Sequence, residues 1–268
     1  MGDPGAFVRL QGLKTPAAVK TVPVRWLDCV KAWALLALAA TALSPRPGAA
    51  GEDLITTARY SDGEEIPYIL NYENLSPRTV VILFPGGDGQ VNPRLENGRL
   101  VYGYRGNFLL RSRKFIIDDE FVTVTTNATW SEPRVQAIIN DLKTRFPAAK
   151  IYLMGTSRGT LATVRLAHYL ADRIAGVIHT ASMADSIHFF DARNYSNRQL
   201  VVHHRQDGCR VTPFASAERS HRAYGNDFIA MDGGISEGDP CEAFAHHGFH
   251  GIEGETIDAI KQWIRRGG

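Results

Sequence analysis

Residues 151–160 read Ile-Tyr-Leu-Met-Gly-Thr-Ser-Arg-Gly-Thr, a short apolar run followed by a glycine-flanked serine. The first four residues are apolar and indicate a buried strand, and the next five form a G-x-S-x-G motif centred on Ser157. Apolar residues spaced four apart then predict a helix: Ala162, Leu166 and Leu170. Gly155 and Gly159 allow an abrupt turn from strand to helix, which strains the backbone at Ser157. The pattern predicts a nucleophilic serine whose hydroxyl stands clear of the sheet, beside the free N–H groups of a helix N-terminus.

Other short apolar segments predict further strands, at residues 79–84, 121–124, 176–180, 200–203 and 227–231. Helical patterns lie between or after most of these segments. Two alternating runs, 55–60 and 66–70, flank a Ser-Asp-Gly-Glu turn and predict an opening hairpin. Strands that alternate with helices predict an α/β fold with a mainly parallel sheet, in which ligands bind at the carboxyl ends of the strands.

The first 50 residues differ in composition from the rest of the chain. Five basic residues precede the largely apolar run Ala32–Leu43, and Ser-Pro-Arg-Pro-Gly-Ala-Ala-Gly follows it. This order is that of a secretory signal, and the small residues Gly48 and Ala50 suit cleavage after Ala50. The run is 12 residues long, shorter than the roughly 20 that span a bilayer. We therefore expect a signal peptide at residues 1–50 and a secreted or periplasmic domain at residues 51–268, with no stable membrane span after cleavage. An uncleaved N-terminal anchor is the alternative.

Removal of the signal peptide changes the net charge of the protein. The whole chain has 30 Lys and Arg against 28 Asp and Glu, and residues 1–50 hold six of the former and two of the latter, which leaves a net charge of −2. The slight basicity of the chain therefore belongs to the targeting segment. Since no basic stripe remains, we expect no nucleic-acid partner.

The cysteines predict a disulfide. Cys29 lies in the expected signal peptide, which leaves Cys209 and Cys241 as an even pair. A protein sent to an oxidising compartment usually pairs such cysteines. Two free thiols are the alternative, because the sequence does not give the distance between the two residues.

Four features of the chain occur together in one known family. They are the G-x-S-x-G turn, a Gly-rich turn after Phe84, an acid after the penultimate strand and a histidine-containing loop before the last helix. With these features the chain resembles the α/β-hydrolase family from about residue 79 to residue 265. The resemblance implies helices on both faces of the sheet and a triad in the chain order Ser, Asp or Glu, His. Residues 181–199 are too few for a large helical lid, and we expect residues 89–118 to fold over the strand ends instead.

The resemblance makes Ser157 the nucleophile and Asp207 the acid. Asp207 closely follows the predicted strand 200–203, where the family places its carboxylate. A carboxylate there would orient the imidazole and stabilise the imidazolium that forms during attack. Asp185, after the preceding strand, is the substitute, and Asp88 is a weaker third choice. An Asp-Gly turn without a catalytic role is the remaining alternative for Asp207.

The catalytic base is expected in the stretch Ala245–Ile252, which contains three histidines. In the family the base is followed by a few apolar or glycine residues before the final helix, and His247-Gly248-Phe249 fits this best. His247 is therefore the predicted base. His250 and His246 remain the alternatives, and His250 is also a candidate for lining the pocket.

An oxyanion hole needs two backbone N–H donors about 3 Å from the developing negative charge. The resemblance assigns one to Arg158, directly after the nucleophile, and the other to the glycine turn, where Gly87 is the first choice. The family often has His-Gly in this turn, whereas here Pro85 precedes Gly86. The position of the second donor is therefore defined only to within one residue. Tyr102 and Tyr104 are assigned to a surface hairpin rather than to the site, and a place in an acyl or leaving-group pocket is the alternative.

The implied function is a secreted serine hydrolase, a carboxylesterase that acts through an acyl-enzyme on a small-molecule ester or related acyl substrate. Such chemistry needs no cofactor. The histidine pairs 203–204 and 246–247 lack the His-Glu-x-x-His pattern, so we expect no metal. A serine peptidase or amidase of the same fold is the enzymatic alternative. A catalytically inactive hydrolase fold that acts as a binding module is the alternative from a different class.

Overall fold

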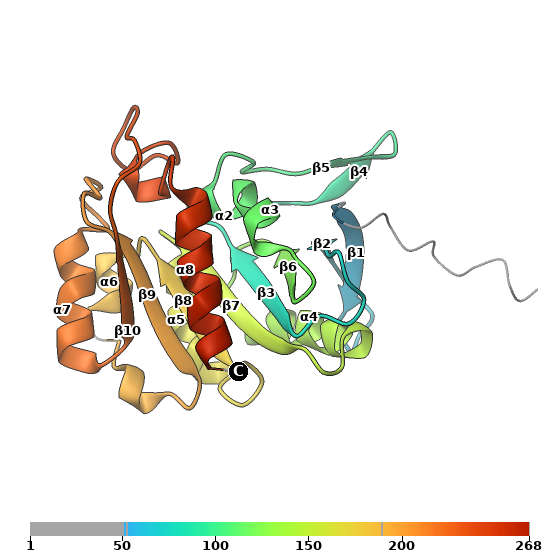
Figure 1. The fold of residues 1–268 in the computed structure, drawn as a ribbon. Coiled ribbons are helices and arrows are strands. Elements are labelled where there is room, and N and C mark those ends of the chain that lie inside the picture. The colour runs from blue at the N-terminus through green and yellow to red at the C-terminus, as the bar shows by residue number, and fades with distance from the viewer. Residues whose placement is uncertain (1–50, 52, 189, 268) are drawn as a thin grey trace, which may run out of the picture. The chain divides into compact units, whose positions relative to one another are not determined.

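The computed structural model describes residue 51, residues 53–188 and residues 190–267 (Figure 1). The predicted signal peptide at residues 1–50 lies outside the described residues and stays a prediction. The described part of the chain is built around one central sheet, with helices packed against it.

Within the described residues, eight strands form this sheet in the order β1-β2-β6-β3-β7-β8-β9-β10. Their bounds are β1 Leu54–Arg59, β2 Glu65–Asn71, β3 Thr79–Phe84, β6 Phe121–Thr125, β7 Lys150–Thr156, β8 Gly176–Thr180, β9 Arg198–His204 and β10 Asp227–Met231. β1 and β2 form the predicted antiparallel hairpin. β2 is also antiparallel to β6, and the other neighbouring pairs in this sheet are parallel. The predicted, mainly parallel α/β sheet is therefore confirmed.

Helices cover both faces of the sheet, because successive side chains of the central strands point to opposite sides. Val80 and Ile82 of β3 enter a core with α4 (Glu132–Arg145), α5 (Gly159–Tyr169) and α7 (Phe214–Tyr224). Val81 and Leu83 enter a second core with α2 (Phe108–Arg111), α3 (Arg113–Ile116) and α8 (Glu253–Arg266). Figure 1 shows α8 lying in front of the sheet. Every residue of β3 is buried, which explains why its sequence is a continuous apolar run.

The longest connections at the carboxyl ends of the strands follow β3 and β10. Between β8 and β9 the described residues contain only α6 (Ala184–Ile187) and the one-turn helix η1 (Ala192–Asn194), so the prediction of no large lid is confirmed there. The long connection after β3 contains a small hairpin of β4 (Arg94–Glu96) and β5 (Arg99–Val101), followed by α2 and α3. This connection reaches the site described next.

A buried polar network lies between the sheet and α5. His179 of β8 is fully buried, with Nδ1 3.0 Å from Thr163 Oγ1 and Nε2 3.1 Å from Gln199 Oε1. Burial disfavours the imidazolium and lowers the pKa of His179 from 6.5 to about 4, although the hydrogen bond to Gln199 acts in the opposite direction. Between these two pH values the unfolded chain therefore binds more protons at this residue than the folded chain. The free energy of unfolding must fall as the pH drops through this range.

We expect His179→Gln to flatten this part of the stability curve, because glutamine does not titrate. Between about pH 7 and about pH 4, wild type should lose about 3 kcal/mol more unfolding free energy than the variant, at about 1.4 kcal/mol per pKa unit. Urea unfolding at several pH values measures the difference. His168→Gln, at an exposed position of α5, is the control and should keep the wild-type pH dependence. Parallel curves for wild type and His179→Gln would contradict the prediction.

Candidate active site

Ser157 lies at the turn between β7 and α5, where the motif predicts it. Its φ is 52°, in the left-handed region, where a non-glycine residue stores strain of order 1–3 kcal/mol. Its backbone N–H donates to the Thr180 carbonyl of β8 at 3.1 Å, which ties the turn to the neighbouring strand. A Cβ atom on Gly155 would lie 2.7 Å from the Gly159 carbonyl oxygen, and one on Gly159 would lie 2.2 Å from the Phe84 carbonyl oxygen. Both positions therefore require glycine.

The glycine turn after β3 packs directly against this serine. A Cβ atom on Gly86 would lie 2.9 Å from Ser157 Cβ, and Gly87 has a φ of 66°. Among the described residues, the backbone N–H groups of Gly87 and Arg158 donate to no carbonyl or side-chain oxygen. Unpaired N–H donors beside a serine hydroxyl suit a developing oxyanion. These two N–H groups are therefore the candidate oxyanion donors.

Asp207 and His247 form a buried hydrogen-bonded pair. His247 lies in the one-turn helix η2 (His246–Gly248), with Nδ1 3.0 Å from Asp207 Oδ2. The Nε2 atom of His247 makes no hydrogen bond to any other residue that the structure describes, and His247 lines the same cleft as Ser157. The structure thus brings Ser157, Asp207 and His247 to one place.

The carboxylate of Asp207 is held by several groups. Its Oδ1 accepts a hydrogen bond from the Cys209 N–H at 2.9 Å, and its Oδ2 accepts one from the Thr212 hydroxyl at 3.0 Å. His203 Nε2 lies 3.2 Å from the same Oδ2 and 2.8 Å from the Thr212 carbonyl oxygen. Burial alone would raise the pKa of Asp207, but the hydrogen bonds from His203 and His247 outweigh burial and hold this pKa well below its ordinary value. The carboxylate is therefore ionised at neutral pH.

Sequence reasoning missed Thr212 and His203 as partners of Asp207. Both are close to it in the chain, and His203 was considered only as a possible metal ligand. The hydroxyl of Thr212 also lies 3.0 Å from His247 Nδ1, so it contacts both members of the pair. The only sequence signal for these roles is position, because Thr212 and His203 flank the acid at the end of β9. No sequence motif predicts that the loop between Asp207 and Thr212 folds back and places the Thr212 hydroxyl on the carboxylate.

The two other histidines of the loop have different contacts. The ring of His246 stacks on His204, with centroids 4.4 Å apart and planes 6° from parallel. His250 Nδ1 lies 3.5 Å from Glu253 Oε1. Among the described residues, neither histidine is hydrogen-bonded to Asp207. The geometry therefore favours His247 over both alternatives.

The substitute acids are also placed differently. Asp88 accepts a hydrogen bond from the Gln90 N–H within its own turn at 2.9 Å. Asp185 lies in α6, exposed, and has no hydrogen bond or ion pair through its carboxylate to another described residue. Neither carboxylate reaches a histidine of the described chain, which leaves Asp207 as the acid that the geometry supports.

No protein-family model matches the sequence, and no curated protein sequence matches it. Solved structures do match. A serine hydrolase without a lid from Xanthomonas campestris aligns with a TM-score of 0.54 at 12% identity, over 81% of this chain and 98% of that one. The esterase domain of a Rhodothermus marinus protein aligns with a TM-score of 0.56 at 10% identity, over 80% and 98%. A thermophilic esterase from Thermogutta terrifontis aligns with a TM-score of 0.52 at 14% identity, over 81% and 99%.

The chain has the α/β-hydrolase fold. At these identities the likeness concerns the fold, while function depends on the site.

Within this α/β-hydrolase fold, a disulfide joins the acid-bearing loop to the wall of the cleft. Cys209 and Cys241 are bonded, with Cα atoms 4.5 Å apart, which confirms the predicted pairing. Cys209 also donates its N–H to Asp207, and Cys241 lines the cleft beside His247. The bond therefore fixes the loop of Asp207 against the segment that leads into His247.

The cleft has a volume of about 430 Å³ and opens at the carboxyl ends of the strands. Ser157 and His247 line it together with the aromatic side chains Tyr104, Phe108 and Phe244. Of residues 89–118, which were predicted to fold over the strand ends, the part around Tyr104–Phe108 lies there, whereas α3 packs against α8 and β6.

The assignment of Tyr104 to a surface hairpin is wrong. The hairpin ends at Val101, and Tyr104 lies beyond it with its ring against Gly87. Tyr102 instead hydrogen-bonds Arg113 Nη2 through its hydroxyl at 2.6 Å and has a structural role. Tyr102 and Tyr104 have different roles because the hairpin ends at Val101. A single sequence does not show where the hairpin ends.

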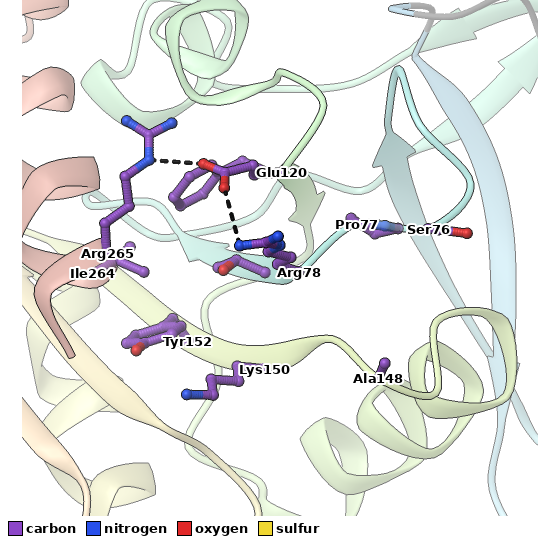
Figure 2. A pocket seen from close by; sticks show the side chains of 11 residues that line it. Ser76, Pro77, Arg78, Glu120, Ala148, Lys150, Tyr152, Ile264 and Arg265 are labelled. Atoms are coloured by element: carbon purple, nitrogen blue, oxygen red, sulfur yellow. Dashed lines mark hydrogen bonds and ion pairs between the residues drawn. The ribbon is translucent and has the colours of Figure 1, made fainter. Parts of the chain in front are cut away.

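A larger cavity, of about 530 Å³, lies at the opposite ends of the strands (Figure 2). Figure 2 shows Glu120 between two arginines, with Arg265 Nε at 2.8 Å and Arg78 Nη1 at 3.8 Å. Thr79 and Lys150, at the amino ends of β3 and β7, also line it. Its lining lacks a hydrogen-bonded acid–histidine pair, so this cavity is not the candidate active site.

Two further properties concern metals and membranes. Within the part of the chain that the structure describes, no three His, Cys, Asp or Glu side chains cluster in a way that would hold a metal ion. None of the helices in that same part has the length and apolar character needed to cross a membrane.

Proposed function

We propose that the protein is a secreted serine hydrolase that cleaves carboxylic esters through an acyl-enzyme on Ser157. One observation carries the proposal. Ser157, in a strained turn, and His247, hydrogen-bonded through Nδ1 to the ionised Asp207, line one cleft. This is the arrangement that activates a serine hydroxyl for attack on a carbonyl carbon.

In the proposed mechanism, Ser157 Oγ attacks the carbonyl carbon while His247 Nε2 accepts the hydroxyl proton. The N–H groups of Gly87 and Arg158 donate to the oxyanion of the tetrahedral intermediate. His247 then gives its proton to the leaving alcohol, and a water molecule repeats the sequence on the acyl-enzyme. Asp207 stays ionised throughout, orients the ring of His247 and stabilises its charged form. The proposed sequence uses no metal and no cofactor.

Two features support export. The targeting segment predicted from residues 1–50 and the Cys209–Cys241 disulfide both suit an oxidising compartment. A small-molecule ester suits the cleft, since it is lined by aromatic side chains and a few polar groups.

A fluorophosphonate probe tests the mechanism, because such probes phosphonylate activated serines. We expect the purified protein to be labelled at one site, located on Ser157 by peptide mass mapping. Ser157→Ala should abolish labelling, and Ser186→Ala, at the nearby helix α6, should not. A panel of nitrophenyl esters and peptide anilides then separates an esterase from a peptidase or amidase. Unlabelled wild type, or labelling that persists in Ser157→Ala, would exclude the proposed mechanism and leave the non-catalytic alternative.

A further inference from the structure

At the carboxyl ends of the strands, a second cavity adjoins the candidate oxyanion donors Gly87 and Arg158. It has a volume of about 320 Å³, and both Gly87 and Arg158 line it. Gly87 also lines the cleft that contains Ser157, so the two cavities share one wall. His247 lines the cleft but not this second cavity.

Hydrogen bonds and a close contact join the two loops that form the second cavity. Gly89 accepts a hydrogen bond from the Ala128 N–H at 2.9 Å, and a Cβ atom on Gly89 would lie 2.4 Å from the Ala128 Cβ atom. Asn127 and Asn92 exchange two hydrogen bonds, at 2.7 Å and 2.8 Å. The loop after β3 and the loop after β6 are therefore locked together, and the cavity between them is preformed.

Two side chains that line the cavity, Trp130 and Arg158, form no hydrogen bond or ion pair with another described residue. Trp130 is 58% exposed, and its ring and indole N–H contact no described aromatic ring, cation or acceptor. The charge of the Arg158 guanidinium acts on the nearby carboxylate of Asp88 and favours its ionised form. Asp88, the one acid of the lining, is already bonded to Gln90 N–H of its own turn. The cavity thus combines an exposed aromatic ring, a guanidinium without a hydrogen bond and the apolar side chains of Leu161 and Ala162, and such a surface is suited to a ligand.

We propose that this cavity binds the acyl group of the substrate, and that the preferred acyl group is aromatic. The assignment rests on the proposed function. His247 must protonate the leaving alcohol, so the alcohol occupies the cleft on the His247 side, and the acyl group extends to the other side of the carbonyl carbon. An aromatic ring there would cover the indole of Trp130. The planar guanidinium of Arg158 would contact the face of the same ring.

A matched pair of nitrophenyl esters tests the assignment. The acyl group of nitrophenyl 3-phenylpropanoate carries an aromatic ring on a two-carbon linker, whereas that of nitrophenyl acetate ends in a methyl group. We expect wild type to favour the phenylpropanoate by at least about tenfold in kcat/KM, and Trp130→Ala to lower this preference by at least about tenfold. Trp130→Phe, which keeps an aromatic ring, should retain most of the preference. Leu75→Ala, which shortens an exposed apolar side chain in the loop between β2 and β3, is the matched control and should keep the wild-type values for both esters.

Several outcomes would overturn the assignment. An equal fall in kcat/KM for both esters in Trp130→Ala would mean that Trp130 stabilises its loop and does not bind the acyl group. Equal rates on the 3-cyclohexylpropanoate and 3-phenylpropanoate esters would overturn the aromatic preference. If Ser157 is never labelled and neither ester is cleaved, the proposed function is wrong, and this result alone does not test the cavity assignment. Calorimetric binding of 3-phenylpropanoate to Ser157→Ala, and its loss in Ser157→Ala with Trp130→Ala, then decides the cavity assignment without turnover.

Discussion

Replacement of His247 by alanine is expected to lower kcat/KM on nitrophenyl acetate by at least about a thousandfold. The loss has two sources, since Ser157 loses the base that accepts its proton and the leaving group loses its acid. Residual hydrolysis should remain, because the candidate oxyanion donors Gly87 and Arg158 are backbone groups that the substitution leaves in place. Initial rates on the purified variant, with thermal unfolding to verify that it is folded, measure the effect.

His246→Ala and His250→Ala are the matched controls, because both histidines lie in the same loop. His246 stacks on His204, and His250 contacts Glu253, so neither is bonded to Asp207. We expect each control to stay within about tenfold of wild type, as for losses of packing or orientation rather than of the base. A large loss in His250→Ala with a small loss in His247→Ala would transfer the role of base to His250. The serine mechanism would survive that result, and the assignment of His247 would not.

The fold was predictable because its signals are local. The continuous apolar run of β3 indicates a strand buried on both faces, and the structure places its side chains alternately in two cores. The hairpin of β1 and β2 follows from alternation on either side of a Ser-Asp-Gly-Glu turn. G-x-S-x-G identifies the sharp turn at Ser157 because two close approaches of backbone exclude every side chain at Gly155 and Gly159.

The surroundings of the candidate site were less predictable, because they depend on contacts between distant segments. Tyr104 reaches Gly87 from a connection whose hairpin ends earlier than expected. The exposure of Trp130 depends on how the loop after β6 packs against Gly89. Thr212 contacts both Asp207 and His247 only because the loop after β9 folds back on the carboxylate. None of these contacts has a spacing or a motif that a single sequence would reveal.

Asp207→Asn is expected to lower kcat/KM by about three to four orders of magnitude while the protein stays folded. The asparagine side chain can still accept the Cys209 N–H through its oxygen, so its NH₂ group would face His247 and Thr212. A donor in that position turns His247 into the tautomer whose proton is on Nε2, and that nitrogen can no longer accept the proton of Ser157. The loss of the negative charge also removes the stabilisation of the imidazolium. Initial rates on nitrophenyl acetate measure the effect.

Asp185→Asn is the control, since this acid follows the preceding strand and was the substitute suggested by sequence. Its carboxylate has no hydrogen bond or ion pair with another residue of the described chain, so its substitution should change the rate by less than about twofold. The pH dependence of kcat/KM in wild type gives a second test of the role of Asp207. Because the hydrogen bonds from His203 and His247 hold the pKa of Asp207 well below its ordinary value, this carboxylate stays ionised at pH values near the ordinary pKa of an aspartate and above. The wild-type profile should therefore show no loss of activity from protonation of Asp207 near the ordinary pKa of an aspartate. A large loss in Asp185→Asn, or wild-type rates in Asp207→Asn, would show that another residue supplies the acid.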